Sequence, residues 1–78
     1  MPILRLFATI RVAAGTGKAS FEGNTVAEVL QNASEAFGKE FSELIPICRI
    51  WVNGDSATAD TEVSEGDEVA LLPPVSGG

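Results

Sequence analysis

The groups that could do chemistry in this chain of 78 residues are few. The sequence contains no histidine and a single cysteine, Cys48. These two facts remove the usual catalytic triads, the imidazole bases, the common zinc sites and any internal disulfide. Carboxylates, lysines and the end of the chain remain as candidates. The end is the most distinctive of these, because the sequence closes on two consecutive glycines, Gly77 and Gly78.

The closing segment has the properties of a tail that enters another protein. Six extended residues span about 20 Å, its two prolines stiffen the exit from the fold, and glycines without Cβ fit a narrow channel. We predict a folded domain over residues 1–74 and a flexible tail over residues 75–78. A carboxylate with a pKa of about 3.5 is ionised at pH 7 and is a poor electrophile, so the Gly78 carboxylate needs activation. The segment consists of Pro73, Pro74, Val75, Ser76, Gly77 and Gly78.

Other reactive side chains are weaker candidates. Cys48 lies in an apolar run, which favours a buried and inert thiol. Lys18 and Lys39 could accept an isopeptide bond, yet exposed lysines are usually only solvated charges. Asp67 and Glu68 flank a turn and are expected to be turn and edge residues rather than an acid and base pair.

Charge and composition narrow the possible partners. Eleven acidic and five basic residues give a net charge of −6, which repels phosphate backbones and anionic membranes. We therefore expect neither a nucleic acid nor a membrane as partner. The acidity could steer the chain toward a basic surface or serve only solubility. Arg5 and Arg11 interrupt the apolar N-terminal stretch, and no run reaches the ~18 residues of a membrane span, so a cytoplasmic location is expected.

Hydrophobic periodicity predicts five strands and one main helix. The helix begins at Val26, where Thr25 and Glu28 have the spacing of a capping box, and Gly38 is expected to end it in the left-handed conformation. Residues 40–46 are predicted to be irregular or short helical structure. Asn53 and Gly54 predict a tight turn. The strands are predicted at residues 3–8, 18–22, 47–52, 56–58 and 68–72.

The order of these elements limits the fold class. A helix that joins one hairpin to later strands packs across the sheet, and the right-handed crossover rule allows the first and last strands to lie side by side in parallel. Both of these strands are the most continuously apolar stretches, as expected for central positions. The sequence therefore predicts an α+β protein with the β-grasp, or ubiquitin-like, arrangement of about five strands.

Three short motifs, taken in order, carry a resemblance to a known family. They are Leu-Phe-Ala at residues 6–8 followed by Arg11, Glu-Gly-Asp-Glu-Val at residues 65–69, and Pro-Pro-Val-Ser-Gly-Gly at residues 73–78. Over its whole length the chain resembles the small subunit of molybdopterin synthase, which is a ubiquitin-like sulfur carrier.

The resemblance implies a function that depends on partner proteins. An E1-like adenylyltransferase would use ATP to activate Gly78, a persulfide would convert it to a thiocarboxylate, and the large subunit of molybdopterin synthase would accept the tail. The chain itself would bind no cofactor and no metal. The family's partner interface matches Phe7, Arg11 and Leu72, although the residues alone slightly favour a place for Phe7 and Leu72 in the sheet core.

Three alternatives stay open. A ubiquitin-like modifier would share the adenylation step but end in an isopeptide bond to a lysine. A related sulfur carrier could serve thiazole synthesis or another pathway. A β-grasp binding module would leave the tail without a role.

Overall fold

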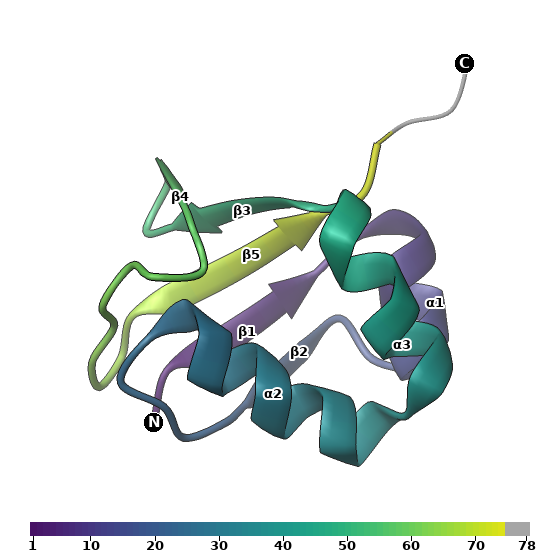
Figure 1. Ribbon diagram of the computed structural model, residues 1–78, viewed down its shortest axis with the longest axis horizontal. Coiled ribbons are helices and arrows are strands. Elements are labelled where there is room, and N and C mark those ends of the chain that lie inside the picture. Colours follow the sequence, from purple (N-terminus) through teal and green to yellow (C-terminus); the bar gives the residue numbers. More distant parts are fainter. Residues whose placement is uncertain (75–78) are drawn as a thin grey trace.

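Five strands form one mixed sheet in the computed structural model, which describes residues 1–74 (Figure 1). The order across the sheet is β2-β1-β5-β3-β4. β1 and β5 are parallel, and every other neighbouring pair is antiparallel. The predicted parallel pairing of the first and last strands is therefore confirmed. The strands are β1 Ile3–Leu6, β2 Lys18–Ser20, β3 Arg49–Val52, β4 Asp55–Ala57 and β5 Glu68–Leu72.

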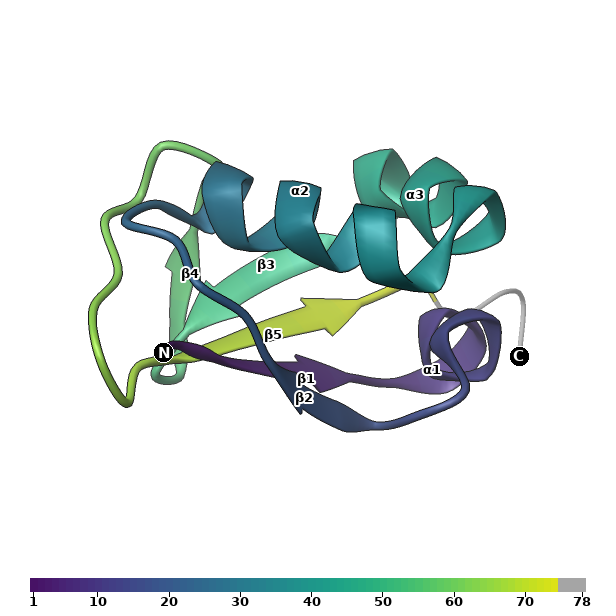
Figure 2. The ribbon, with the colours of Figure 1, turned by 90° about the horizontal axis from the view of Figure 1, so that it is seen from below.

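The helices lie on one side of this sheet and at one of its ends. α2 (Val26–Phe37) and α3 (Lys39–Leu44) cover one face, and α1 (Ala8–Ala14) lies at the end where the chain leaves β5 (Figure 2). A short 3-10 helix, η1 (Ile45–Ile47), connects α3 to β3. This arrangement confirms the β-grasp fold. Within residues 1–74, no helix has the length and apolar character needed to cross a bilayer.

The start of α2 follows from its capping residues. The Thr25 hydroxyl accepts a hydrogen bond from the Glu28 backbone N–H at 3.3 Å. The Glu28 carboxylate accepts one from the N–H of Asn24 at 2.9 Å, one residue before the position that the capping-box prediction implies. The prediction for Gly38 is wrong in detail. Its φ of 97° and ψ of −170° are not left-handed helical, because the chain extends there before α3 begins at Lys39.

α1 was not predicted, and it shortens the first strand. β1 ends at Leu6 rather than at residue 8. Ala8 has a φ of +54°, which turns the chain out of the strand and costs a non-glycine residue roughly 1–2 kcal/mol. Burial of Ile10 offsets this cost, and Gly15 ends the helix in the left-handed conformation. The predicted boundaries of β2, β3 and β4 are also too long or shifted by one or two residues, while β5 matches its prediction.

The core lies between the sheet and the helices. Register sets the facing residues: Leu4 pairs with Val69, and Leu6 with Leu71, so all four point toward α2 and α3. Each buried aliphatic or aromatic side chain contributes roughly 1.5–3 kcal/mol of transfer free energy. The buried hydrophobic residues are Leu4, Leu6, Ile10, Val26, Val29, Leu30, Ala33, Phe41, Val63, Val69 and Leu71.

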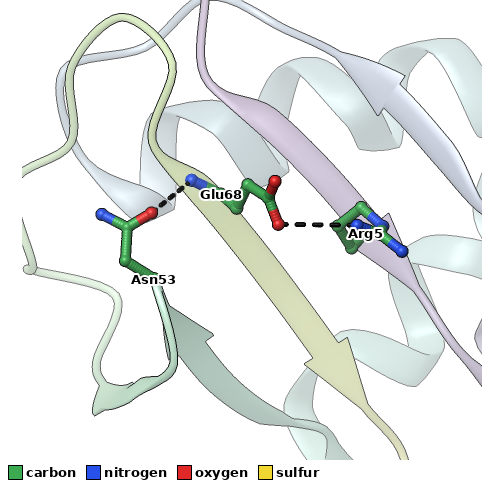
Figure 3. A network of polar contacts seen from close by, with 3 residues as sticks. All are labelled: Arg5, Asn53 and Glu68. Atoms are coloured by element: carbon green, nitrogen blue, oxygen red, sulfur yellow. Dashed lines mark hydrogen bonds and ion pairs between the residues drawn. The ribbon is translucent and has the colours of Figure 1, made fainter.

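A network of hydrogen bonds and one ion pair holds the end of the sheet that lies away from α1, where β3 turns into β4 (Figure 3). The Asn53 Oδ1 accepts a hydrogen bond from the Glu68 backbone N–H at 2.9 Å, and its Nδ2 donates one to Asp67 Oδ1 at 3.0 Å. The Glu68 carboxylate pairs with Arg5 Nη1 at 3.5 Å. The turn is thereby tied to β5, and β5 to β1.

Because the network includes the Asp67 carboxylate, the free energy of unfolding should decrease at acid pH. Hydrogen bonds, first from the Asn53 amide and then from the Ser64 backbone N–H, lower the pKa of Asp67 below its ordinary value. A lowered pKa in the folded state stabilises the fold fully above the unfolded pKa of about 3.9, and this stabilisation is lost as the pH falls through the folded pKa.

We expect Asp67→Asn to lower Tm by a few degrees at pH 7 and the difference from the unchanged chain to shrink below about pH 4. A difference that stays constant down to pH 2, measured by circular dichroism, would contradict this assignment.

Candidate functional site

α2 and α3 cover one face of the sheet and leave the other face open (Figure 2). The strand pairings place a row of residues from all five strands on this open face. Residues paired in neighbouring strands point to the same face, so each pairing extends the row. From one edge of the sheet to the other, the row consists of Lys18, Arg5, Ala70, Trp51 and Ser56.

Phe7 and Leu72 occupy the next row, where the chain leaves the sheet. Leu6 pairs with Leu71, and Phe7 continues β1 in extended conformation, with φ of −133° and ψ of 155°. The register therefore places Phe7 beside Leu72 on the open face. Both side chains are exposed, to 41% and 37%. Their assignment to the sheet core is wrong, and they form an apolar pair, which we call the exit pair.

The exit pair stands at the root of the predicted tail. Pro73, which follows Leu72, is buried, whereas Pro74 is exposed. A buried proline with a fixed φ holds the direction in which the chain leaves β5. The four remaining tail residues of the prediction, Val75, Ser76, Gly77 and Gly78, lie outside the described residues.

Arg11 lies beside the exit pair on α1. Its side chain packs over Gly17, where an added Cβ would come within 3.1 Å of Arg11 Nε. Phe7 and Arg11 line one shallow cleft of about 360 Å³, between the end of β1, α1 and the start of β2. The structure thus brings Phe7 together with Leu72 on one side and with Arg11 on the other. The cleft is lined by Arg5, Leu6, Phe7, Arg11, Thr16, Gly17 and Lys18.

The cations of this acidic chain are concentrated around the exit pair. Of its five basic residues, Arg5, Lys18 and Arg49 lie on the open face and Arg11 lies next to it. The strand register places one acidic residue, Glu68, on this face. The net charge of −6 therefore hides a cationic surface, which the sequence analysis missed. Finding it requires the strand register, which alone shows that these cations share a face.

The other reactive side chains have ordinary structural roles. Cys48 precedes β3 rather than lying within it; its half-buried thiol contacts the Leu44 carbonyl at 3.2 Å, and burial raises the thiol pKa. A raised pKa keeps the thiol protonated and poorly nucleophilic at neutral pH. The carboxylates of Asp67 and Glu68 bond to different partners, Asn53 and Arg5, so they do not form an acid and base pair.

Fold and geometry together define a β-grasp domain with an exposed apolar pair and a cationic rim where its C-terminal segment begins. The sequence matches the ThiS family over residues 4–78. The chain belongs to the ThiS family, and the family of ubiquitin-like sulfur carriers predicted from its motifs is confirmed. Among curated proteins, none matched the sequence.

Similar solved structures include two archaeal SAMP1 proteins and a subunit of a molybdopterin-converting factor. SAMP1 from Haloferax volcanii is 29% identical, with a TM-score of 0.83 over 99% of this chain and 98% of that one. The small archaeal modifier protein 1 of Methanosarcina acetivorans is 27% identical, with a TM-score of 0.88 over 99% and 95%. In a complex of subunits 1 and 2 of molybdopterin-converting factor from Helicobacter pylori 26695, the matching chain is 26% identical, with a TM-score of 0.69 over 99% and 97%.

Adjacent residues of β5 should respond differently to truncation. Leu71 is fully buried, so Leu71→Ala should lower the free energy of unfolding by about 2–5 kcal/mol. Leu72→Ala, on the open face, should cost less than about 1 kcal/mol. Urea denaturation followed by Trp51 fluorescence provides both values. Equal losses in the two variants would mean that Leu72 belongs to the core.

Proposed function

We propose that this chain is a cytoplasmic sulfur carrier for molybdopterin synthesis. Its Gly78 carboxylate is adenylated by an E1-like enzyme, converted to a thiocarboxylate and used as sulfur donor in complex with the large subunit of molybdopterin synthase. The observation that carries this proposal is the family match, which continues through the tail to Gly78. The exit pair at the root of that tail supports it.

The chemistry fits a chain with so few reactive groups. A carboxylate oxygen of Gly78 attacks the α-phosphorus of ATP, which releases pyrophosphate and leaves an acyl adenylate. A persulfide sulfur then attacks the acyl carbon and displaces AMP, forming an acyl disulfide. A second thiol cleaves that disulfide and releases the thiocarboxylate. The partners supply ATP, persulfide and thiol, so the carrier needs neither a base nor a metal of its own.

The exit pair and its rim supply the surface for docking. An interface needs an apolar centre surrounded by polar groups, and Phe7 and Leu72 provide that centre. Arg5, Arg11 and Arg49 provide a cationic rim that matches an acidic partner surface and orients the chain on encounter. In the Helicobacter pylori structure, a chain of this fold is bound to a second subunit of molybdopterin-converting factor. We infer the same kind of contact here.

A second candidate function is protein modification. The similar structures include SAMP1, the small archaeal modifier protein 1, of Methanosarcina acetivorans. A modifier shares the adenylation of Gly78, but an amine attacks the activated carbonyl and forms an isopeptide bond. Conjugates of high mass that disappear when Gly78 is deleted would favour this candidate over the sulfur carrier.

Sulfur loading can be measured on the intact protein. When the chain is incubated with ATP, a persulfide source and an E1-like enzyme, thiocarboxylate formation should add about 16 Da, and oxidation of Met1 or Cys48 would add nearly the same mass. An alkylating reagent that traps the thiocarboxylate separates the two. A chain that lacks Gly77 and Gly78 should fold equally well and acquire no trapped product. Absence of the product from the intact chain in a system that loads another carrier would refute the proposal.

Docking can be tested apart from sulfur chemistry. Phe7→Ala and Leu72→Ala should each weaken binding to the large subunit about tenfold, because truncating a central apolar contact typically costs more than 1 kcal/mol. Glu35→Ala, on the exposed side of α2, is the matched control and should bind normally. Isothermal titration calorimetry measures the Kd values, and melting curves check the fold. Unchanged Kd values in both variants would place the interface elsewhere.

A further inference from the structure

The turn between β3 and β4 contains a reactive dipeptide that the carrier function does not use. The chain has three asparagines, at positions 24, 32 and 53, and only Asn53 precedes a glycine. A glycine without Cβ leaves its backbone nitrogen free to approach the preceding side chain. An Asn-Gly pair can therefore undergo deamidation. The Gly54 nitrogen attacks Asn53 Cγ, a C–N bond forms, and the side-chain nitrogen leaves as ammonia. Water then opens the resulting succinimide to aspartate or isoaspartate.

The native hydrogen bonds oppose this reaction. Both polar atoms of the Asn53 amide are engaged on the β5 side, with Asp67 at 3.0 Å and with the Glu68 N–H at 2.9 Å. The Asn53 backbone N–H also donates to the Glu68 carbonyl at 2.9 Å. Cyclisation requires the amide to leave these partners and turn toward Gly54. Since the turn is exposed, water reaches it as soon as it opens.

Deamidation would turn the attractive contact between Asn53 and Asp67 into a repulsive one. Asn53 Nδ2 donates to a carboxylate, but an aspartate at position 53 has no proton to donate at neutral pH and adds a negative charge against Asp67. Asp55 and Glu68 add further negative charge near the turn, and the cation Arg5 already pairs with Glu68. The N-terminal ammonium, which lies beside the turn that carries Asp67, is paired with Glu65 at 3.1 Å. No described group in this network is placed to neutralise the added charge.

We propose that Asn53 is a modification site, at which deamidation is held back by its hydrogen bonds to Asp67 and Glu68 and, once it occurs, replaces the hydrogen bond between the β3–β4 turn and Asp67 with a repulsion between two carboxylates. The site lies at the end of the sheet opposite the exit pair, because Val52 pairs with Val69 while Arg49 pairs with Leu72. The modification therefore weakens the fold from the far end and leaves the docking surface chemically unchanged.

Incubation of the whole chain at alkaline pH, followed by peptide mass spectrometry, tests whether the native hydrogen bonds slow deamidation. Deamidation adds about 1 Da, and it should occur at Asn53 and not at Asn24 or Asn32, which serve as internal controls. In the folded chain the reaction should be at least about tenfold slower than in urea, since it requires local opening. Asp67→Asn should accelerate it in the folded chain. Equal rates in folded and urea-unfolded protein, or an unmodified Asn53 in urea, would overturn the proposal.

A double-mutant cycle tests the consequence. Asn53→Asp should lower Tm by about 5 °C, the scale of one lost hydrogen bond in a domain of this size. In the double variant N53D/D67N the amide and carboxylate exchange places, so the donor and acceptor match again and Tm should rise above that of N53D alone. A double variant that melts at the sum of the two single losses would contradict the contact. Both experiments use the isolated chain, so their outcome is independent of the sulfur-carrier proposal.

Discussion

The parallel pairing of β1 with β5 is the constraint on which the rest of the structure depends. It joins the two ends of the chain at the centre of the sheet and turns Leu4, Leu6, Val69 and Leu71 toward the helices. Because side chains alternate along a strand, the same register places the following residues on the opposite face. The core and the proposed docking surface are thus two consequences of one register, and a one-residue slip would exchange them.

The two ends of the sheet have different roles. One end is closed by hydrogen bonds in which Asn53 joins the β3–β4 turn to β5 (Figure 3). At the other end the chain leaves β5 beside exposed apolar side chains, and α1 contributes Arg11 to the cleft next to them. A chain of 78 residues has a net free energy of unfolding of only about 4–12 kcal/mol, so it tolerates little backbone strain or buried polar structure. The stabilising network lies at the end of the sheet away from the proposed docking surface, so docking does not require any of its hydrogen bonds to break.

Sequence patterns predicted the elements that local chemistry specifies. The capping residues of α2 and the apolar run of β5 gave the start of the helix and both ends of the strand. α1 escaped prediction because Phe7 offers no side-chain cap and Ala8 adopts a positive φ, so the helix is held mainly by tertiary packing of Ile10, Ala13 and Ala14 against the core. The family resemblance implied a partner-facing Phe7, but the residues alone could not decide between core and surface, and the cationic face escaped prediction. Both depend on strand register, which is a property of the assembled sheet.

The proposed function places the transferred sulfur on the C-terminal carboxyl group of Gly78. Its most direct test is tandem mass spectrometry of the C-terminal peptide from chain purified out of its native cells in the presence of an alkylating trap. We expect a fraction of the peptides to be alkylated on a terminal thiocarboxylate and Cys48 to carry no persulfide. A terminus found only as free carboxylate, together with a persulfide on Cys48, would contradict it.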